Sequence, residues 1–355
     1  EYAFRGAYVR RDGRINYGIG INYRARHEFR QIDPRPHNIV NDLTGTIGAG
    51  FSTDRSLIAL TARGRIYKQS QEGGFFDNTV EFLMTGLGNY FARYVGGEDQ
   101  SLFYKGKGYA LSLTAVPSRT CGWSALLQYE RFSNRNIFSE LNYAPAGRLV
   151  TQTLSGSVAR RYERGGFAVE GSYELRQGFE NVVDNGETAD YRILGEFAMY
   201  RNRTLRLAAG GMVTWNRPQT DYTLAPSVGY FRTSADYPYP KREIALSTAG
   251  AGCDLHLTRH GQRGTLRATV GGRHAGNPTR HTLLTDSRLD PDIGAMLFDS
   301  VDRMTADVVE LTAALRAERE LRRSLALFVD ASWRPGIYMD GVRVHLATIA
   351  CGICF

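Results

Sequence analysis

The chain closes with VHLATIACGICF, residues 344–355, and this stretch has two faces when every second residue is read. One face is apolar without interruption: Ala347, Ile349, Cys351, Ile353 and Phe355. Successive side chains of a β-strand point to opposite sides of its sheet. The ending therefore predicts a strand whose apolar face includes Phe355.

The same alternation recurs along the chain. The segments that show it are 15–24, 42–51, 57–68, 103–116, 122–132, 149–161, 167–176, 189–200, 205–215, 244–258, 264–275, 305–319 and 325–334. Many are about 10–15 residues long, whereas strands of soluble proteins usually have about 5–6. A tilted strand needs about 9–11 residues to cross a bilayer.

Aromatic residues such as Trp123 and Trp215 lie near the ends of several segments. Membrane barrels carry aromatic girdles at such positions. We therefore predict an all-β, transmembrane, antiparallel outer-membrane β-barrel rather than a soluble sandwich. Segment 305–319 also suits an amphipathic helix, but its alternation favours a strand.

The lengths of the connections support this prediction. If Phe355 lies at the periplasmic end, every long connection falls on the other side, as in bacterial barrels. The predicted extracellular loops are 30–38, 69–101, 133–148, 178–188, 216–242 and 276–303. This scheme puts a periplasmic turn at 201–203 and treats 222–232 as loop; as a strand, 222–232 would make 16 strands and break the alternation of sides.

The scheme gives 15 strands in a single barrel domain, residues 1–355, and its first strand runs toward the periplasm. An even-numbered barrel with its N-terminus in the periplasm needs a further strand before Glu1. We therefore expect N-terminal strand sequence to be missing and 16 or more strands in the whole protein.

Charge and composition narrow the function classes. The chain has 355 residues and a net charge of +8, and all but four of its 44 basic residues are arginines. The arginines are spread over nearly every segment, which argues against a nucleic-acid-binding stripe. No uncharged apolar run reaches 18 residues. We expect no signal peptide in this sequence, because its first residues already have the pattern of a strand. The four cysteines are interpreted as small hydrophobic residues, and Cys351 and Cys354 lie on opposite faces of their strand.

The face opposite Phe355 carries the charges, because a charge on the lipid side costs about 2–4 kcal/mol at mid-depth. The candidate solute path in this lumen consists of Arg24, Arg26, Arg63, Arg65, Arg176, Arg192, Arg206, Arg267, Arg273, Arg316, Arg334, Glu170, Glu196 and Asp330. Two interpretations stay open. The arginines line a path that favours anions, or the charges pair with one another and plug the lumen.

The long loops contain aromatic residues that are candidate contacts for a partner or ligand: Phe75, Phe76, Tyr90, Tyr237 and Tyr239. The same residues also suit a loop that folds inward and packs into the mouth of the barrel, and this alternative stays open.

No motif of a known catalytic, metal or cofactor site occurs in the chain, so we expect no catalytic residue, no metal and no cofactor. His345 lies on the predicted lipid side, where outer-membrane lipases place a Ser–His pair. A lone histidine near a strand end is more often an interface residue, and an enzyme is the least favoured class.

The ending at Phe355 resembles the C-terminal signal by which bacterial outer-membrane barrels are recognised by the assembly machinery. That resemblance implies an outer-membrane location, with outer-membrane lipid and the barrel-assembly machinery as partners.

A second resemblance rests on RQIDPRPHNIVNDLTGTIGAGF (30–51), MTGLGNYFARYVGG (84–97) and YKGKGYALSLTAVP (104–117). Together these look like an uncharacterised outer-membrane barrel family of the Bacteroidota, and the similarity covers most of the chain. Members carry roughly a hundred or more further N-terminal residues, and their genes often lie near TonB-dependent receptors and small lipoproteins. The resemblance implies a role in nutrient or metal uptake, beside a TonB-dependent receptor or surface lipoprotein, and carries over no ligand residues.

The expected function is passive transport or an accessory role in uptake. The first alternative is a closed structural or surface-binding barrel that holds a partner through its loops, and the second is a membrane-embedded lipase.

Overall fold

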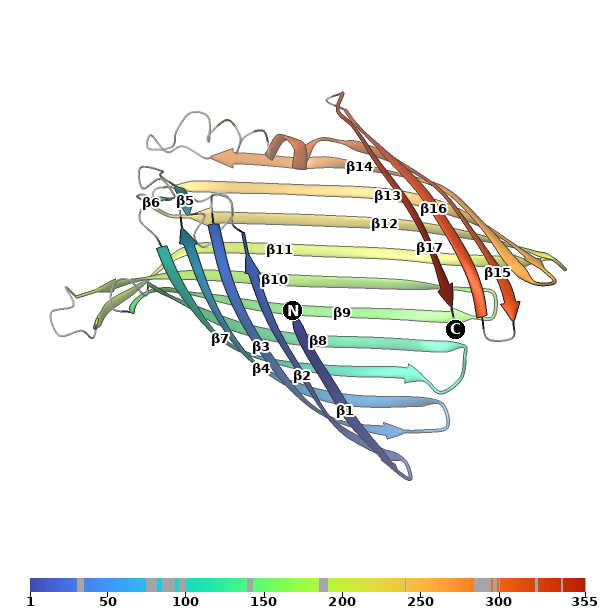
Figure 1. Ribbon diagram of the computed structural model, residues 1–355, viewed down its shortest axis with the longest axis horizontal. Coiled ribbons are helices and arrows are strands. Elements are labelled where there is room, and N and C mark those ends of the chain that lie inside the picture. Colours follow the sequence, from blue (N-terminus) through green and yellow to red (C-terminus); the bar gives the residue numbers. More distant parts are fainter. Residues whose placement is uncertain are drawn as a thin grey trace.

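Fifteen antiparallel strands follow one another in chain order and form one curled sheet (Figure 1). The strands are β1 (Tyr2–Asp12), β2 (Ile15–Phe29), β3 (Arg35–Ser52), β4 (Ser56–Gly74), β7 (Gln100–Pro117), β8 (Gly122–Phe138), β9 (Ala144–Tyr162), β10 (Gly165–Val183), β11 (Ile193–Asn216), β12 (Thr220–Tyr237), β13 (Arg242–Gly261), β14 (Gly264–Leu283), β15 (Val308–Arg322), β16 (Leu325–Tyr338) and β17 (Arg343–Cys354). Two short strands, β5 (Phe82–Met84) and β6 (Arg93–Val95), pair with each other between β4 and β7. The all-β prediction is confirmed.

This computed structural model describes residues 1–30, 35–74, 82–84, 93–95, 100–138, 143–184, 191–239, 241–283, 295, 299, 301–322, 325–339 and 341–354. Among these residues, no helix is long and apolar enough to span a membrane. The two edge strands are β1 and β17, which face the viewer in Figure 1 while β8–β12 form the far wall.

The two ends of the sheet differ in their connections. Short turns join the strands at one end, which we call the turn end, at 13–14, 53–55, 118–121, 163–164, 217–219, 262–263 and 323–324. At the other end, the loop end, the joining segments are mostly longer: 30–34, 75–99, 139–143, 184–192, 238–241, 284–307 and 339–342. The two ends of the sheet thus differ in the lengths of their connections, and the extracellular position of the loop end stays a prediction.

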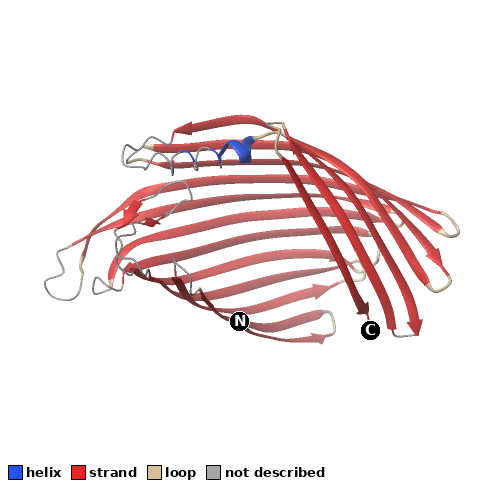
Figure 2. Cartoon of the chain, turned by 45° about the horizontal axis from the view of Figure 1, so that its top comes forward, coloured by secondary structure: helices blue, strands red, loops and turns tan. Residues whose placement is uncertain are grey.

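The sheet curls, so that it has a convex and a concave face (Figure 2). These two faces differ in chemistry. On a curved sheet, side chains splay apart on the convex face and crowd together on the concave face. Large apolar side chains splay outward and are exposed, as at Ile19 (63%), Leu60 (58%) and Val270 (65%). Their polar or glycine neighbours along the same strands are half-buried, as at Asn16 and Thr61. The convex face is therefore apolar, and the concave face is polar.

Aromatic side chains bound the apolar convex face at both ends. Near the turn end, Trp123 packs edge-on against Phe167 at 5.6 Å between ring centroids, and the Arg160 guanidinium lies 5.1 Å from the Trp123 centroid. Nearer the loop end, the rings of Tyr109 and Tyr129 lie 6.2 Å apart. Rings with an apolar body and a polar edge suit a membrane–water interface.

The predicted loop 216–242 is wrong, since residues 220–237 form strand β12. The predicted turn at 201–203 is also wrong, because β11 runs without a break through these residues and has 24 residues in all. The two errors offset each other, so the count of 15 strands is right although two of the strands were misplaced.

The remaining predicted loops are shorter in the structure, because the strands continue beyond the apolar part of the sheet. Strand β4 runs to Gly74, and β8 runs to Phe138. Where both faces of a strand meet water, polar residues can continue the strand. The start of polar sequence therefore predicted the start of each loop several residues too early.

Candidate functional site

The concave face of β3, β4 and β8 holds a cluster built around Arg65. Its Nε and Nη2 atoms donate to the two carboxylate oxygens of Asp42, both at 2.8 Å. The guanidinium also lies over the ring of Phe132, 4.8 Å from the centroid. A two-point ion pair that also stacks on a ring fixes the arginine in one orientation.

Glycines on β7 create the room for this stacking. Phe132 lies across β7 above Gly106 and Gly108, where an added Cβ would come within 2.5 Å and 2.9 Å of the ring. The Phe132 ring meets Tyr67 edge-on at 6.1 Å. The two glycines therefore let a β8 side chain reach residues of β4 across the intervening strand.

Arg63 spans the same strand one step nearer the turn end. Its Nη2 donates to Glu130 Oε2 on β8 at 2.6 Å, across the small buried Ala110. Beside Arg63, an open groove of ≈ 570 Å³ runs over β1–β4. Its polar lining includes Arg5, Asn16, Asn22, Thr44, Thr46 and Thr61.

Most of the predicted lumen residues lie on the concave face. By strand register these are Arg24, Arg26, Arg63, Arg65, Glu170, Arg176, Arg206, Arg267, Arg273, Arg316, Asp330 and Arg334. Their role in a solute path stays a prediction, since it requires a transport measurement.

Ion pairs join some of these residues and not others. Besides the pairs of Arg63 and Arg65, the predicted lumen residues form the ion pairs Arg26–Glu28, Arg273–Glu310 at 3.5 Å and Arg316–Glu318 at 3.7 Å. Within the described residues, five of the predicted arginines have no ion pair: Arg24, Arg176, Arg206, Arg267 and Arg334. The lumen face is therefore neither free of ion pairs nor fully neutralised by them.

The lumen prediction for Glu196 is wrong, and the one for Arg192 stays a prediction. Strand β11 has one extra residue opposite Gly178 and Phe179, so the pairing passes from Tyr200 to Ala198. A one-residue shift turns the side chains on the far side of the bulge, here those of the residues before Met199, to the other face of the sheet. Glu196 therefore lies on the convex face, where it pairs with Arg148 at 2.7 Å. Arg192 lies in the connection before β11, and its backbone N–H donates to Asp184.

The predicted loop contacts have different outcomes. Tyr237 is buried at the end of β12, and its hydroxyl donates to Glu180, so it is not an exposed contact as predicted. Tyr239 is 78% exposed. Phe75, Phe76, Tyr90 and the predicted assembly-signal residue Phe355 lie outside the described residues.

A charged pair lies beside Tyr239 at the loop end. The Lys241 ammonium donates to Glu243 at 2.7 Å. This hydrogen bond raises the pKa of Lys241 and lowers the pKa of Glu243. Both groups are therefore charged at neutral pH, and the loop end is polar at this position.

Sequence reasoning missed a helical segment that packs onto the concave face near the loop end. Val301 is fully buried against Ile244 and Leu246 of β13. Asn277 holds the end of the segment, because its Nδ2 donates to the Ala306 carbonyl at 3.0 Å and its N–H to Asp307 at 2.9 Å. The sequence carried a signal for it, because Leu297 and Val301 are four residues apart and Phe298, Val301 and Met304 recur every third residue, which is helical spacing within a stretch taken as loop.

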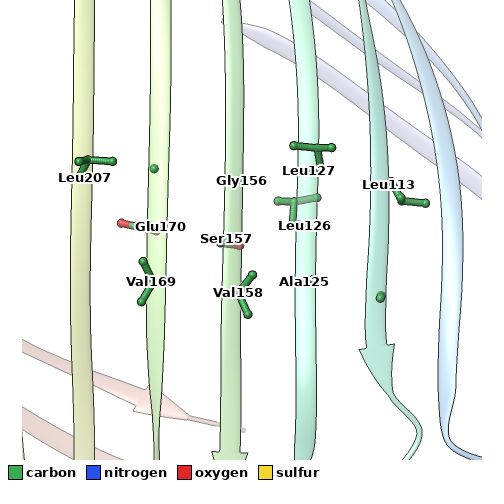
Figure 3. Close-up of a pocket in the computed structure, with 12 residues that line it drawn as sticks. Leu113, Ala125, Leu126, Leu127, Gly156, Ser157, Val158, Val169, Glu170 and Leu207 are labelled. Carbon is green, nitrogen blue, oxygen red and sulfur yellow. The ribbon is translucent and has the colours of Figure 1, made fainter.

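The convex face has a hollow of its own. An open groove of ≈ 550 Å³ crosses β7–β11 (Figure 3). Leucine and valine side chains form its walls. Gly156 and Gly171, which have no side chain, line its floor and give the groove its depth. The groove therefore offers an apolar surface of the kind that lipid chains contact.

His345 lies on the convex face, as the alternation predicts. His345 stacks on Trp333 with 6.0 Å between ring centroids and an interplanar angle of 5°. In the described part of the chain, no group of three or more histidine, cysteine, aspartate or glutamate residues is arranged to hold a metal ion.

Several solved membrane barrels are similar to the chain at low identity. The translocator domain of autotransporter NalP from Neisseria meningitidis is 12% identical, with 97% of this chain and 89% of that chain covered and a TM-score of 0.29. The copper transporter OprC is 10% identical, with 96% and 61% covered and a TM-score of 0.49. The FrpB iron transporter from Neisseria meningitidis is 8% identical, with 98% and 64% covered and a TM-score of 0.47.

The chain thus spans less than two thirds of the two transporters that it resembles. Strand topology and the chemistry of the two faces, rather than these likenesses, define the fold. A comparison with curated proteins finds no match. A family model matches residues 1–355, and the chain belongs to that family, described as "Family of unknown function (DUF6850)".

Proposed function

We propose that this protein is a β-barrel of the bacterial outer membrane whose concave face gives anionic solutes a path, in passive transport or beside a nutrient uptake system. The membrane location is supported by the convex face. Soluble monomers rarely expose large continuous apolar patches, whereas here apolar side chains cover the convex face between two sets of aromatic residues.

The transport role is supported by one observation above all. Five concave arginines have no ion pair among the described residues: Arg24, Arg176, Arg206, Arg267 and Arg334. A guanidinium is always charged and offers several N–H donors that match carboxylate and phosphate oxygens. A lumen lined by such groups favours anions over cations.

Single-channel recording in a planar bilayer tests this function. We expect the wild-type protein to conduct with anion selectivity, read from the reversal potential in a KCl gradient. The triple variant Arg206→Gln, Arg267→Gln, Arg334→Gln removes three concave charges and should lower that selectivity at least about twofold.

A matched control removes three charges from the convex face near the turn end: Arg10→Gln, Arg160→Gln, Arg319→Gln. This variant should keep the wild-type selectivity. A wild-type barrel that inserts and never conducts, or a selectivity equal in all three proteins, rejects the anion path.

The second candidate is a closed barrel that holds a partner at its loop end, and the buried contact of Val301 favours it. The segment that carries Val301 packs on the concave face of β13, against Ile244 and Leu246. The partner class is the one that the family resemblance implies, a TonB-dependent receptor or a surface lipoprotein, and exposed Tyr239 is a described residue within its reach.

The substitution Val301→Ser separates the two candidates. It removes apolar contact and buries an unpaired hydroxyl. The free energy that keeps the segment packed on β13 should therefore fall by about 1–3 kcal/mol. If the segment closes the barrel, this variant should open more often than the wild type in single-channel records. Arg303→Ser changes an exposed side chain of the same segment and should leave the open time unchanged. An equal open time in the wild type and Val301→Ser contradicts closure by this segment.

A further inference from the structure

A row of basic side chains crosses four neighbouring strands near the loop end. In the strand register, Lys68 of β4 lies opposite Lys105 of β7, and Lys105 lies opposite Arg135 of β8. Arg135 in turn lies opposite Arg148 of β9. We call Lys68, Lys105 and Arg135, with Arg148 at the end, the basic row. Neighbouring strands are about 4.8 Å apart, so the four charges follow one another closely.

The basic row belongs to the convex face. Lys68 and Lys105 continue the outward-facing sets that contain Ile66 and Tyr109, and Lys68, Lys105 and Arg135 are exposed. Two further basic residues, Lys107 and Arg131, lie on the same face one and two steps nearer the apolar region. Three of the four lysines of the chain therefore gather in this one patch.

The patch is poorly neutralised by the protein itself. Arg148 pairs with Glu196 and lies over the Phe179 ring at 4.7 Å. In the parts of the chain that the structure describes, Lys68, Lys105, Lys107, Arg131 and Arg135 have no carboxylate partner. Like charges placed directly opposite each other destabilise a sheet, so the arrangement gains stability from an anion that comes from outside the chain.

The depth of the patch indicates which anion. It lies beyond Tyr109 and Tyr129, on the loop-end side of the apolar region, where the headgroups of the outer leaflet would meet the barrel. Basic residues just outside the hydrocarbon layer bind anionic lipid headgroups. Phosphate oxygens accept charge-assisted hydrogen bonds from lysine and arginine.

We propose that the basic row binds the phosphate groups of a lipid headgroup in the outer leaflet; this rests on the proposed membrane location. The convex groove of Figure 3 lies on β7, β8 and β9, three of the four strands of the row, further toward the turn end. Acyl chains that descend from a headgroup at the row meet apolar surface all along these strands.

The test measures lipid retention by the full chain, refolded in detergent, with native mass spectrometry. The probes are lipid A with two phosphates and the dephosphorylated glycolipid with the same acyl chains. We expect the wild type to retain the phosphorylated lipid and to lose most of it in high salt, because exposed charges are screened. The variant Lys68→Gln, Lys105→Gln, Arg135→Gln should bind it roughly 100-fold more weakly.

The convex control Arg10→Gln, Arg160→Gln, Arg319→Gln loses the same charge at the turn end and should bind as the wild type does. Excess inorganic phosphate should not displace the lipid, and displacement would show a site for free phosphate instead. Equal retention of the two lipids, or full retention by the Lys68, Lys105, Arg135 variant, overturns the proposal.

Circular dichroism of each variant checks that the sheet has formed. Insertion into vesicles, followed by flotation, is scored separately. A protein that inserts but does not distinguish the lipids refutes only the lipid site, whereas a folded protein that does not insert refutes the proposed membrane function.

Discussion

Arg65 illustrates how single residues shape the concave face. Its guanidinium is held by the Asp42 carboxylate and by the Phe132 ring, and the ring reaches it only because β7 has glycine at positions 106 and 108. A charge that is both paired and stacked is a fixed part of the wall. By contrast, Arg206 lies over Phe231 at 5.3 Å with no ion pair in the described chain. The described concave arginines therefore divide into ones held by an ion pair and ones without an ion pair, and the proposed anion path would use the second group.

The role of Gly106 can be tested by adding one methyl group. Gly106→Ala places a Cβ 2.5 Å from the Phe132 ring, so the ring must move away from Arg65. We expect a loss of about 1–3 kcal/mol in the free energy of unfolding, as is usual for overpacking. Gly64→Ala on β4 meets no atom within 4 Å and should be close to neutral.

Urea unfolding in lipid vesicles measures both variants. Replacing Phe132 by Leu in the Gly106→Ala background should restore part of the loss, because the smaller side chain leaves room for the methyl group. If Gly106→Ala and Gly64→Ala have equal free energies of unfolding, the close contact between Phe132 and β7 does not limit stability.

Strands β11 and β12 are the two elements whose positions the sequence pattern predicts wrongly. Residues 201–203 form a periplasmic turn in the predicted scheme because 216–242 is counted there as one external loop. Residues 201–203 lie near the loop end, beyond the apolar part of β11, where both faces of a strand can be polar. The predicted scheme treats 222–232 as loop because a further strand there breaks the alternation of sides, and the segment contains Pro226, which lacks the N–H that a central strand needs. In the structure Pro226 lies where the register between β11 and β12 is interrupted.

The bulge in β11 explains the remaining errors at the level of elements. Alternation predicts a face only while the register holds, and Met199 adds one residue that no partner on β10 matches. Glu196 thereby passes to the convex face. The sequence carries no local mark of this change, because a bulge is defined by the neighbouring strand as much as by its own residues.

At the scale of the whole molecule, the two faces of the sheet determine where a charge is tolerated. Leu207 and Ala208 are neighbours on β11, and Leu207 is exposed on the convex face beside Gly171. Ala208 lies on the concave face opposite Glu170. The chain thus offers two adjacent positions with opposite surroundings.

Leu207→Arg should therefore lower the free energy of unfolding in lipid vesicles by about 2–4 kcal/mol, the cost of an arginine at mid-depth in a bilayer. Ala208→Arg gains a carboxylate neighbour in the polar lumen and should change stability by less than about 1 kcal/mol. Urea titration monitored by tryptophan fluorescence gives both values. Equal losses in the two variants would show that the convex face does not contact lipid.

The sequence by itself determined the class of fold, because a repeating period of two with one apolar face can be satisfied only by strands. It also determined which face of most strands carries the charges, as at Arg63, Glu170 and Asp330. Only the tertiary structure decided which charges meet. The Arg63–Glu130 contact spans two strand steps and 67 residues of chain, and the basic row exists because the register sets Lys68, Lys105 and Arg135 side by side. Alternation gives the direction of a side chain, whereas its neighbours depend on register, and register arises only when the strands pair.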